Sequence, residues 1–98
     1  MNTVNTYEVM YIINPGVEDE ARTQLVERFS SIVTAGGGTV EKVDDWGKRK
    51  LAYPIQDLND GHYILMHFSA NPELPHELER NMKINENIMR YLVIRKDA

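Results

Sequence analysis

The chain has 98 residues, of which 42% are hydrophobic and 27% are charged, and its net charge is −4. This length fits one domain with a modest core, and the composition is typical neither of disordered nor of fibrous chains. The longest uninterrupted apolar run has five residues, whereas a membrane-spanning helix needs about 20. The absence of cysteine excludes disulfides, a thiol nucleophile and thiolate metal ligands. We expect a single cytoplasmic domain over residues 1–98, with no membrane association and no secretory signal.

The charge is unevenly distributed along the chain. Residues 1–47 have a net charge of −5, whereas residues 48–98 have a net charge of +1. The second half contains the run Lys48-Arg49-Lys50, and residues 80–96 hold five basic side chains against Glu86 alone. The acidic total argues against a protein that coats nucleic acid without specificity, but it leaves room for a local anion-binding surface.

The first predicted strand runs from Tyr7 to Ile13, where aromatic and β-branched residues precede the turn residues Asn14-Pro15-Gly16. Its almost continuous apolar character indicates a central strand that is covered on both faces. A helix follows, because apolar residues recur every three to four positions from Val17 to Val33. Gly36-Gly37-Gly38 ends this helix, since glycine adopts the left-handed conformation that is common at helix exits.

From Thr39 to Trp46 the period changes to two, which predicts a strand with one exposed face. Gly47 could mark a bulge, and the strand extends toward Pro54, which suits a strand end. Gln56 to Gly61 is predicted as a polar turn, and His62 to Phe68 as a third strand.

Asn71 to Pro75 opens a second helix, and Ile88 to Lys96 forms the last predicted strand. Three apolar residues of this helix should point inward: Leu74, Leu78 and Met82. The order β-α-β-β-α-β is that of a ferredoxin-like sandwich. We therefore predict an α+β fold in which two helices cover one face of a four-stranded antiparallel sheet.

Alternation along the strands places large apolar side chains on the face of the sheet away from the helices, called the open face below. If Val9, Tyr11 and Ile13 point toward the helices, residues of the opposite parity point away. An exposed apolar patch usually marks a partner surface, although helix edges and long side chains could also cover it. The candidate partner-binding residues are Met10, Ile12, Tyr63, Leu65 and Leu92.

Two groups of basic residues could contact nucleic acid. Lys48-Arg49-Lys50 could bind phosphates, with Trp46 and Tyr53 close by for base stacking. These residues could equally form a charged edge strand that deters unwanted pairing. The second group could share one end of the sheet or be a solvated surface, and consists of Arg80, Lys83, Arg90, Arg95 and Lys96.

No motif supports catalysis, metal binding or a cofactor. Gly36-Gly37-Gly38 follows a helix instead of opening one, and Asp57 to Gly61 departs from a calcium loop in the place of its glycine. The three histidines lack metal-ligand spacing, and no serine lies in a nucleophile motif. The loop after the first strand lacks the arginine that a ferredoxin-like acyl-phosphate hydrolase requires. We expect neither an enzyme nor a small-molecule substrate.

Several segments together resemble a known family. They are Tyr7-Glu8-Val9 running to Asn14-Pro15, Val40 to Ile55, Gly61-His62-Tyr63 and Asn85 to Tyr91. They resemble bacterial small-subunit ribosomal protein six over nearly the whole chain. Asp45 to Ile55 is the most specific part, because its Trp-Gly, basic and Leu-Ala-Tyr-Pro-Ile elements stand in order.

The resemblance implies a non-catalytic domain that binds small-subunit (16S) ribosomal RNA cooperatively with a basic partner, small-subunit protein eighteen. A basic companion would explain how a net-acidic protein binds RNA, and a partner would explain a partly apolar open face. Arg90 lies in the matched motif and is the first predicted RNA contact. Tyr63 could contact either the RNA or the protein partner from the open face. The other predicted RNA contacts are Lys48, Arg49 and Lys50, and, from charge and expected location alone, Lys83 and Arg95.

A different class of function stays open on the residues alone. A ferredoxin-like regulatory or oligomerisation module would also use its open sheet to pair with a protein. Tight self-association without salt-dependent RNA binding would distinguish this alternative.

Overall fold

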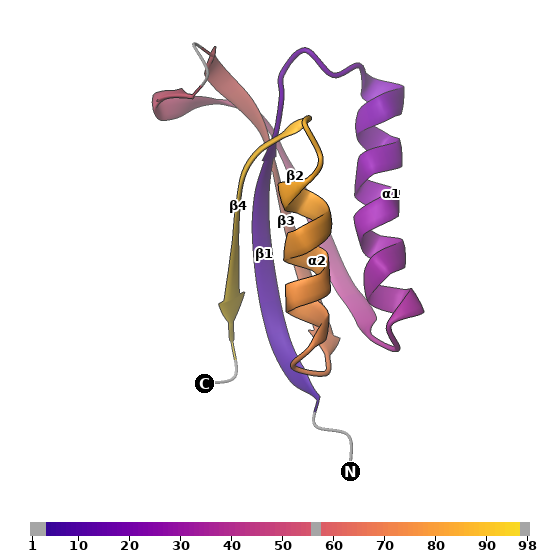
Figure 1. Cartoon of the computed structure of the whole chain (residues 1–98). Helices are drawn as coiled ribbons and strands as arrows, with labels where there is room; N and C mark the ends of the chain where they lie inside the picture. Colours follow the sequence, from indigo (N-terminus) through magenta and orange to yellow (C-terminus); the bar gives the residue numbers. More distant parts are fainter. Residues whose placement is uncertain (1–3, 56–57, 97–98) are drawn as a thin grey trace.

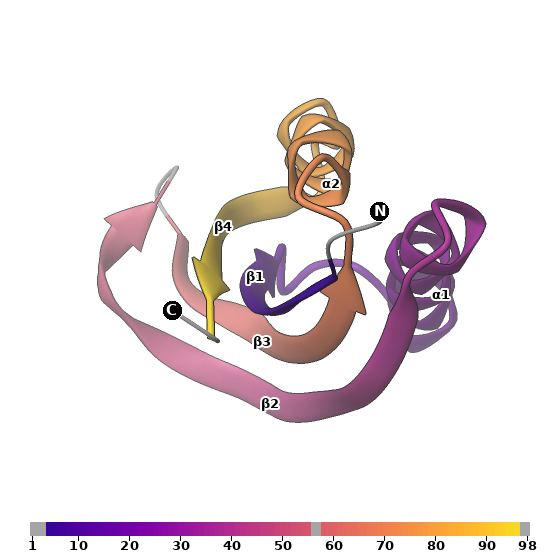
Figure 2. The same cartoon turned by 90° about the horizontal axis from the view of Figure 1, so that it is seen from below.

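The structure is a computed structural model that describes residues 4–55 and 58–96 (Figure 1). Its four strands form one antiparallel sheet in the order β2-β3-β1-β4, and both helices cover the same face of that sheet (Figure 2). This arrangement confirms the predicted ferredoxin-like sandwich. The elements are β1 (Asn5–Ile13), α1 (Asp19–Ala35), β2 (Thr39–Ile55), β3 (Leu58–Ala70), α2 (Leu74–Lys83) and β4 (Ile88–Arg95).

The core lies between the helices and the sheet, and the predicted parity of β1 is confirmed. Val9, Tyr11 and Ile13 are fully buried against the helices. Because paired residues in a sheet share a face, the cross-strand partners of Tyr11, which are Ile64 and Tyr91, point the same way. The helices contribute Phe29, Val33, Leu74, Leu78 and Met82 to the same core.

Two glycines hold conformations that other residues rarely adopt. The exit from α1 is left-handed at Gly37, whose φ is +85°. Gly47 has a φ of +78°, and the pairing of β2 with β3 shifts between Asp45 and Gly47. The predicted bulge is therefore confirmed.

The hairpin of β2 and β3 is longer than predicted. The turn expected from Gln56 to Gly61 is wrong for Leu58–Gly61, because Arg49 pairs with Gly61 and Lys50 with Asp60. The rest of that expected turn lies outside the described residues. Residues 58–61 have a composition typical of a turn, but they pair with β2 and form the start of β3. Pro54 is accommodated because β2 is an edge strand.

The far part of this hairpin curves round the open face toward β4 (Figure 2). Leu51 is 7% exposed, and together with Ile12 and Tyr53 it lines a small hollow. Gly61 is required at this point, because a β-carbon there would collide with the Ile12 side chain. Neither helix in the described part of the chain has the length and apolar character of a membrane-spanning helix.

Candidate nucleic-acid interface

A shallow apolar hollow of about 230 Å³ lies on the open face, between β1, β3 and β4. It is lined by Met10, Ile12, Tyr63, Arg90, Tyr91 and Leu92. Four of the five candidate partner residues therefore meet in one place. Leu92 is 59% exposed at its edge, so the hollow is open to a partner.

The predicted apolar patch is only partly exposed, because two of its five candidate residues, Ile12 and Leu65, are buried. Their exposed fractions are only 7% and 8%. Ile12 is covered by the curved hairpin at Gly61. Leu65 sits on β3 between Met10 of β1 and Asp44 of β2, so neighbouring side chains flank it on both sides. These two residues can form the floor of the surface but offer little contact area of their own.

Arg90 projects from β4 on the open face, opposite Ile12 of β1. Its guanidinium carbon lies 4.9 Å from the centre of the Tyr53 ring, which the curved hairpin brings across the sheet. A guanidinium that stacks on a ring through its flat face keeps the N–H donors along its edge available for a phosphate. The sequence placed Tyr53 near the basic run but gave no signal of this pairing.

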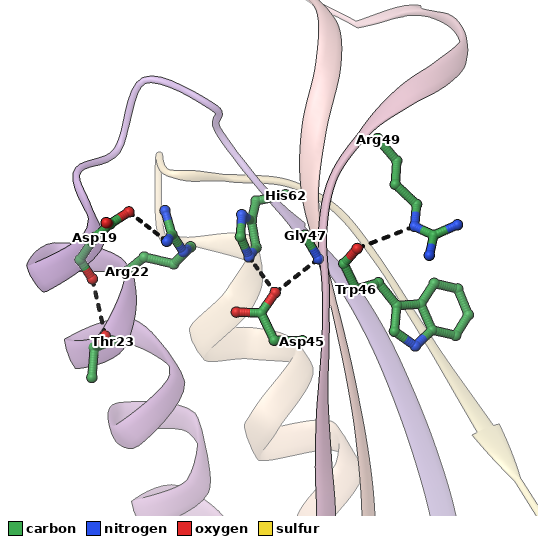
Figure 3. Close-up of polar contacts among 8 residues, drawn as sticks. All are labelled: Asp19, Arg22, Thr23, Asp45, Trp46, Gly47, Arg49 and His62. Atoms are coloured by element: carbon green, nitrogen blue, oxygen red, sulfur yellow. Dashed lines mark hydrogen bonds and ion pairs between the residues drawn. The ribbon is translucent and has the colours of Figure 1, made fainter.

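The basic run on β2 divides between the two sides of the hairpin. Arg49 pairs with Gly61 and shares the open face, whereas Lys48 and Lys50 pair with His62 and Asp60. All three side chains are exposed. Arg49 lies over Trp46 at 5.3 Å from the ring centre, and its Nε donates to the Trp46 carbonyl oxygen at 3.2 Å (Figure 3). Within the described residues, Lys48 and Lys50 have no ion-pair partner.

Asp45 holds the bulge that presents Trp46. Its Oδ1 accepts a hydrogen bond from the Gly47 backbone N–H at 2.8 Å and lies 2.5 Å from Nε2 of His62 (Figure 3). His62 is 8% exposed, so it is a structural partner of Asp45. Sequence reasoning gave Asp45 no role, although a carboxylate two residues before a glycine is a recognisable signal of a local turn.

The predicted grouping of basic residues at one end of the sheet is only partly correct. Lys83 at the end of α2 and Arg90 near the start of β4 lie toward the end that carries the hairpin (Figure 1). Arg95 and Lys96 lie at the opposite end, because β4 runs away from that hairpin. Arg95 contacts Asn5 at 3.1 Å, and Lys96 lies 3.2 Å from a Glu8 carboxylate oxygen.

Among the residues that the structure describes, no group of three histidine, aspartate or glutamate side chains is arranged so that it could hold a metal ion.

Similarity to known proteins identifies the family. A family model described as Ribosomal protein S6 matches residues 6–95. The chain belongs to this family. A small ribosomal subunit protein bS6 of Desulforamulus reducens is 50% identical over 93 residues, which are 95% of this chain and 98% of that protein. The bS6 protein of Clostridium novyi is 47% identical over 91 residues, 93% of this chain and 96% of its own length.

A solved structure agrees with this assignment. The crystal structure of 30S ribosomal protein S6 from Thermotoga maritima superposes with a TM-score of 0.91 at 35% identity, covering 96% of this chain and 89% of that one. Members of the ribosomal protein S6 family are structural components of the small ribosomal subunit and are not enzymes. The chain is thus a component of the cytoplasmic ribosome, as the resemblance implied.

Proposed function

We propose that this chain binds small-subunit (16S) ribosomal RNA cooperatively with small-subunit protein eighteen. The observation that carries the proposal is the position of Arg90, which forms one wall of the apolar hollow while its guanidinium stacks on Tyr53. A surface for a protein partner and a cationic contact for RNA meet at this residue. Membership of the ribosomal protein S6 family supports ribosomal RNA as the nucleic acid.

The partner would dock on the apolar hollow. Met10, Tyr63 and Leu92 would contact it directly, with Ile12 as the floor and Leu65 buried beside Met10. Glu8 lies on the same face, but its carboxylate is already paired within the chain, 3.5 Å from His67 and 3.2 Å from Lys96. The surface offered to the partner is therefore chiefly apolar.

RNA would contact the cations at the hairpin end of the molecule. Arg90, Lys48, Arg49 and Lys50 are the main contacts, Lys83 lies at the same end, and Arg95 is the most distant member of the set. Phosphate contacts of this kind give affinity that depends on salt, whereas the folded RNA supplies shape specificity. A partner that orders this surface first lowers the cost of the RNA contact, which is positive coupling between the two sites.

The test is a titration of labelled central-domain RNA of the small subunit with this chain, with and without protein eighteen, at two salt concentrations. We expect weak binding by the chain alone and tight, salt-sensitive binding with the partner. Absence of binding in both conditions contradicts the proposal.

Substitution of Arg90 tests the central residue. Arg90→Ala should weaken RNA binding in the presence of the partner by about 1–3 kcal/mol, the range for charge-assisted contacts. Arg80 belongs to the second basic group of the sequence, but its guanidinium pairs with Glu77 at 2.8 Å and it is not among the proposed contacts. Arg80→Ala, which removes the same charge from an exposed side chain, is therefore the matched control. An Arg90 variant that binds RNA as tightly as the control excludes Arg90 from the interface.

A self-association module is the second candidate. Leu92 and Ile94 are 59% and 46% exposed on β4, which is an edge strand. Exposed apolar residues on an edge strand favour pairing with another chain. Sedimentation of the chain alone, combined with the RNA titration above, separates the two candidates, because a tight dimer that does not bind RNA fits only this one.

A further inference from the structure

A second groove, of about 320 Å³, lies on the helix side of the molecule, between α1 and the loop that leads into β4. Its polar lining consists of one guanidinium and three amides, without a carboxylate. The lining residues are Ala21, Gln24, Leu25, Arg28, Asn85 and Asn87. The neighbouring groove between α1 and β2 differs, because Glu27 and Asp45 contribute carboxylates to it. Of these two grooves, the one at Arg28 is the one whose lining suits an anionic ligand rich in hydroxyl groups.

The loop that forms one wall of this groove is held by its own hydrogen bonds. The Asn87 backbone N–H donates to Oδ1 of Asn85 at 2.9 Å, and the Asn14 backbone N–H donates to the Asn87 carbonyl oxygen at 2.8 Å. The Ile88 N–H donates to the Asn85 carbonyl oxygen at 3.1 Å. A fixed loop presents its side-chain amides without a large ordering cost on binding.

Arg28 differs from the other arginines of the helices. Arg22 pairs with Asp19 at 2.6 Å and Arg80 with Glu77 at 2.8 Å. Arg28 is exposed, and its side chain makes no hydrogen bond or ion pair with any residue that the structure describes. Its planar group of five donors is therefore free to bind a phosphate.

We propose that the groove formed by Gln24, Arg28, Asn85 and Asn87 is a second RNA contact, separate from the one at Arg90. Arg28 binds a phosphate, and the amides take hydrogen bonds with ribose 2′-hydroxyls or base edges. The groove lies on the helix side of the sheet, so a partner on the open face leaves it accessible. This inference rests on the proposed function, because it assumes that the chain binds RNA.

The first test compares two variants that lose the same charge. With protein eighteen present, Arg28→Ala should weaken binding of central-domain RNA about three- to tenfold at fixed salt. It should also lower the slope of log affinity against log salt by about 1, the effect of one lost phosphate contact. Arg28→Lys should restore the slope, and Arg80→Ala should leave both quantities unchanged.

The outcomes separate the two proposals. If wild type binds RNA but Arg28→Ala behaves like Arg80→Ala, the second contact is overturned and the proposed function stands. If Arg28→Ala weakens association with protein eighteen in the absence of RNA, the groove is a protein surface and the inference is again overturned. If wild type does not bind RNA at all, the proposed function fails first.

The second test locates RNA directly. The chain has no cysteine, so Gln24→Cys provides a single thiol in the groove for a tethered Fe(II)–EDTA group. Ser31→Cys, also exposed and further along α1, is the matched control. Strand cleavage from position 24 and not from position 31 supports the proposal, and a complex that forms without cleavage from position 24 refutes it.

Discussion

The hydroxyl of Tyr11 is a buried polar group without a visible role. The ring packs edge-on against Phe29 with 5.2 Å between ring centres, and the residue is 0% exposed. Among the described residues the hydroxyl has no hydrogen-bond partner. Burial raises the pKa of this phenol, and the charge of Asp45 adds to the effect, so the group stays neutral. An unpaired buried hydroxyl costs about 1–3 kcal/mol.

Replacing Tyr11 tests this cost. Tyr11→Phe keeps the ring contact with Phe29 and removes only the hydroxyl, so we expect the free energy of unfolding to rise by about 1 kcal/mol. Urea denaturation at neutral pH measures the change. Tyr11→Ala, which also removes the ring, should lose about 3–5 kcal/mol. A Phe variant that is clearly less stable than wild type would mean that the hydroxyl has a partner.

The β2–β3 hairpin determines which side chains of the open face are exposed. Its curvature buries Leu51 against Ile12 and brings Tyr53 onto Arg90. The close contact at Gly61 is the point where the hairpin meets β1. The same element therefore closes part of the apolar surface and positions the arginine beside it.

A methyl group at Gly61 should displace the hairpin from Ile12 of β1. Gly61→Ala is expected to destabilise the fold by about 1–3 kcal/mol, the usual cost of overpacking, because the new methyl collides with Ile12. It should also weaken RNA binding, because Tyr53 then leaves Arg90. Gly16→Ala is the control, since its β-carbon meets only the end of the Asn14 side chain at 3.2 Å. Thermal unfolding and the RNA titration provide the two measurements, and equal behaviour of both variants would contradict this role of Gly61.

The strands differ in how many buried side chains stabilise them. β1 lies between β3 and β4, and three of its side chains are fully buried. The far part of the hairpin has only its two strands, with Leu51 as the single buried side chain among residues 48–55. Local opening costs least where few buried contacts are lost.

Hydrogen exchange should follow this difference. We expect the slowest amide exchange in β1 and much faster exchange in residues 48–55 of the free chain. Binding of protein eighteen and RNA should slow exchange in residues 48–55 more than in the first half of α2, which lies outside the proposed contacts. Equal protection of β1 and the hairpin in the free chain would contradict the uneven distribution of stability.

The sequence predicted the order of elements and the helix-facing parity of β1, because periodicity records burial directly. It missed the start of β3, since Leu58–Gly61 has the composition of a turn and is paired only through β2. It missed the burial of Ile12 and the stacking of Arg90 on Tyr53 because both depend on the curvature of the sheet. The groove at Arg28 joins two segments far apart in the sequence, and local pattern gives no signal of it.

The bulge at Gly47 has an optical consequence. It presents Trp46, the only tryptophan in the chain, with 40% of its surface exposed and Arg49 stacked over the indole. Indole emission responds to water and to nearby charge, so a partner that covers the hairpin should shift its wavelength and intensity. The excited state of one native side chain can therefore follow assembly in real time, without a dye or a label on the protein.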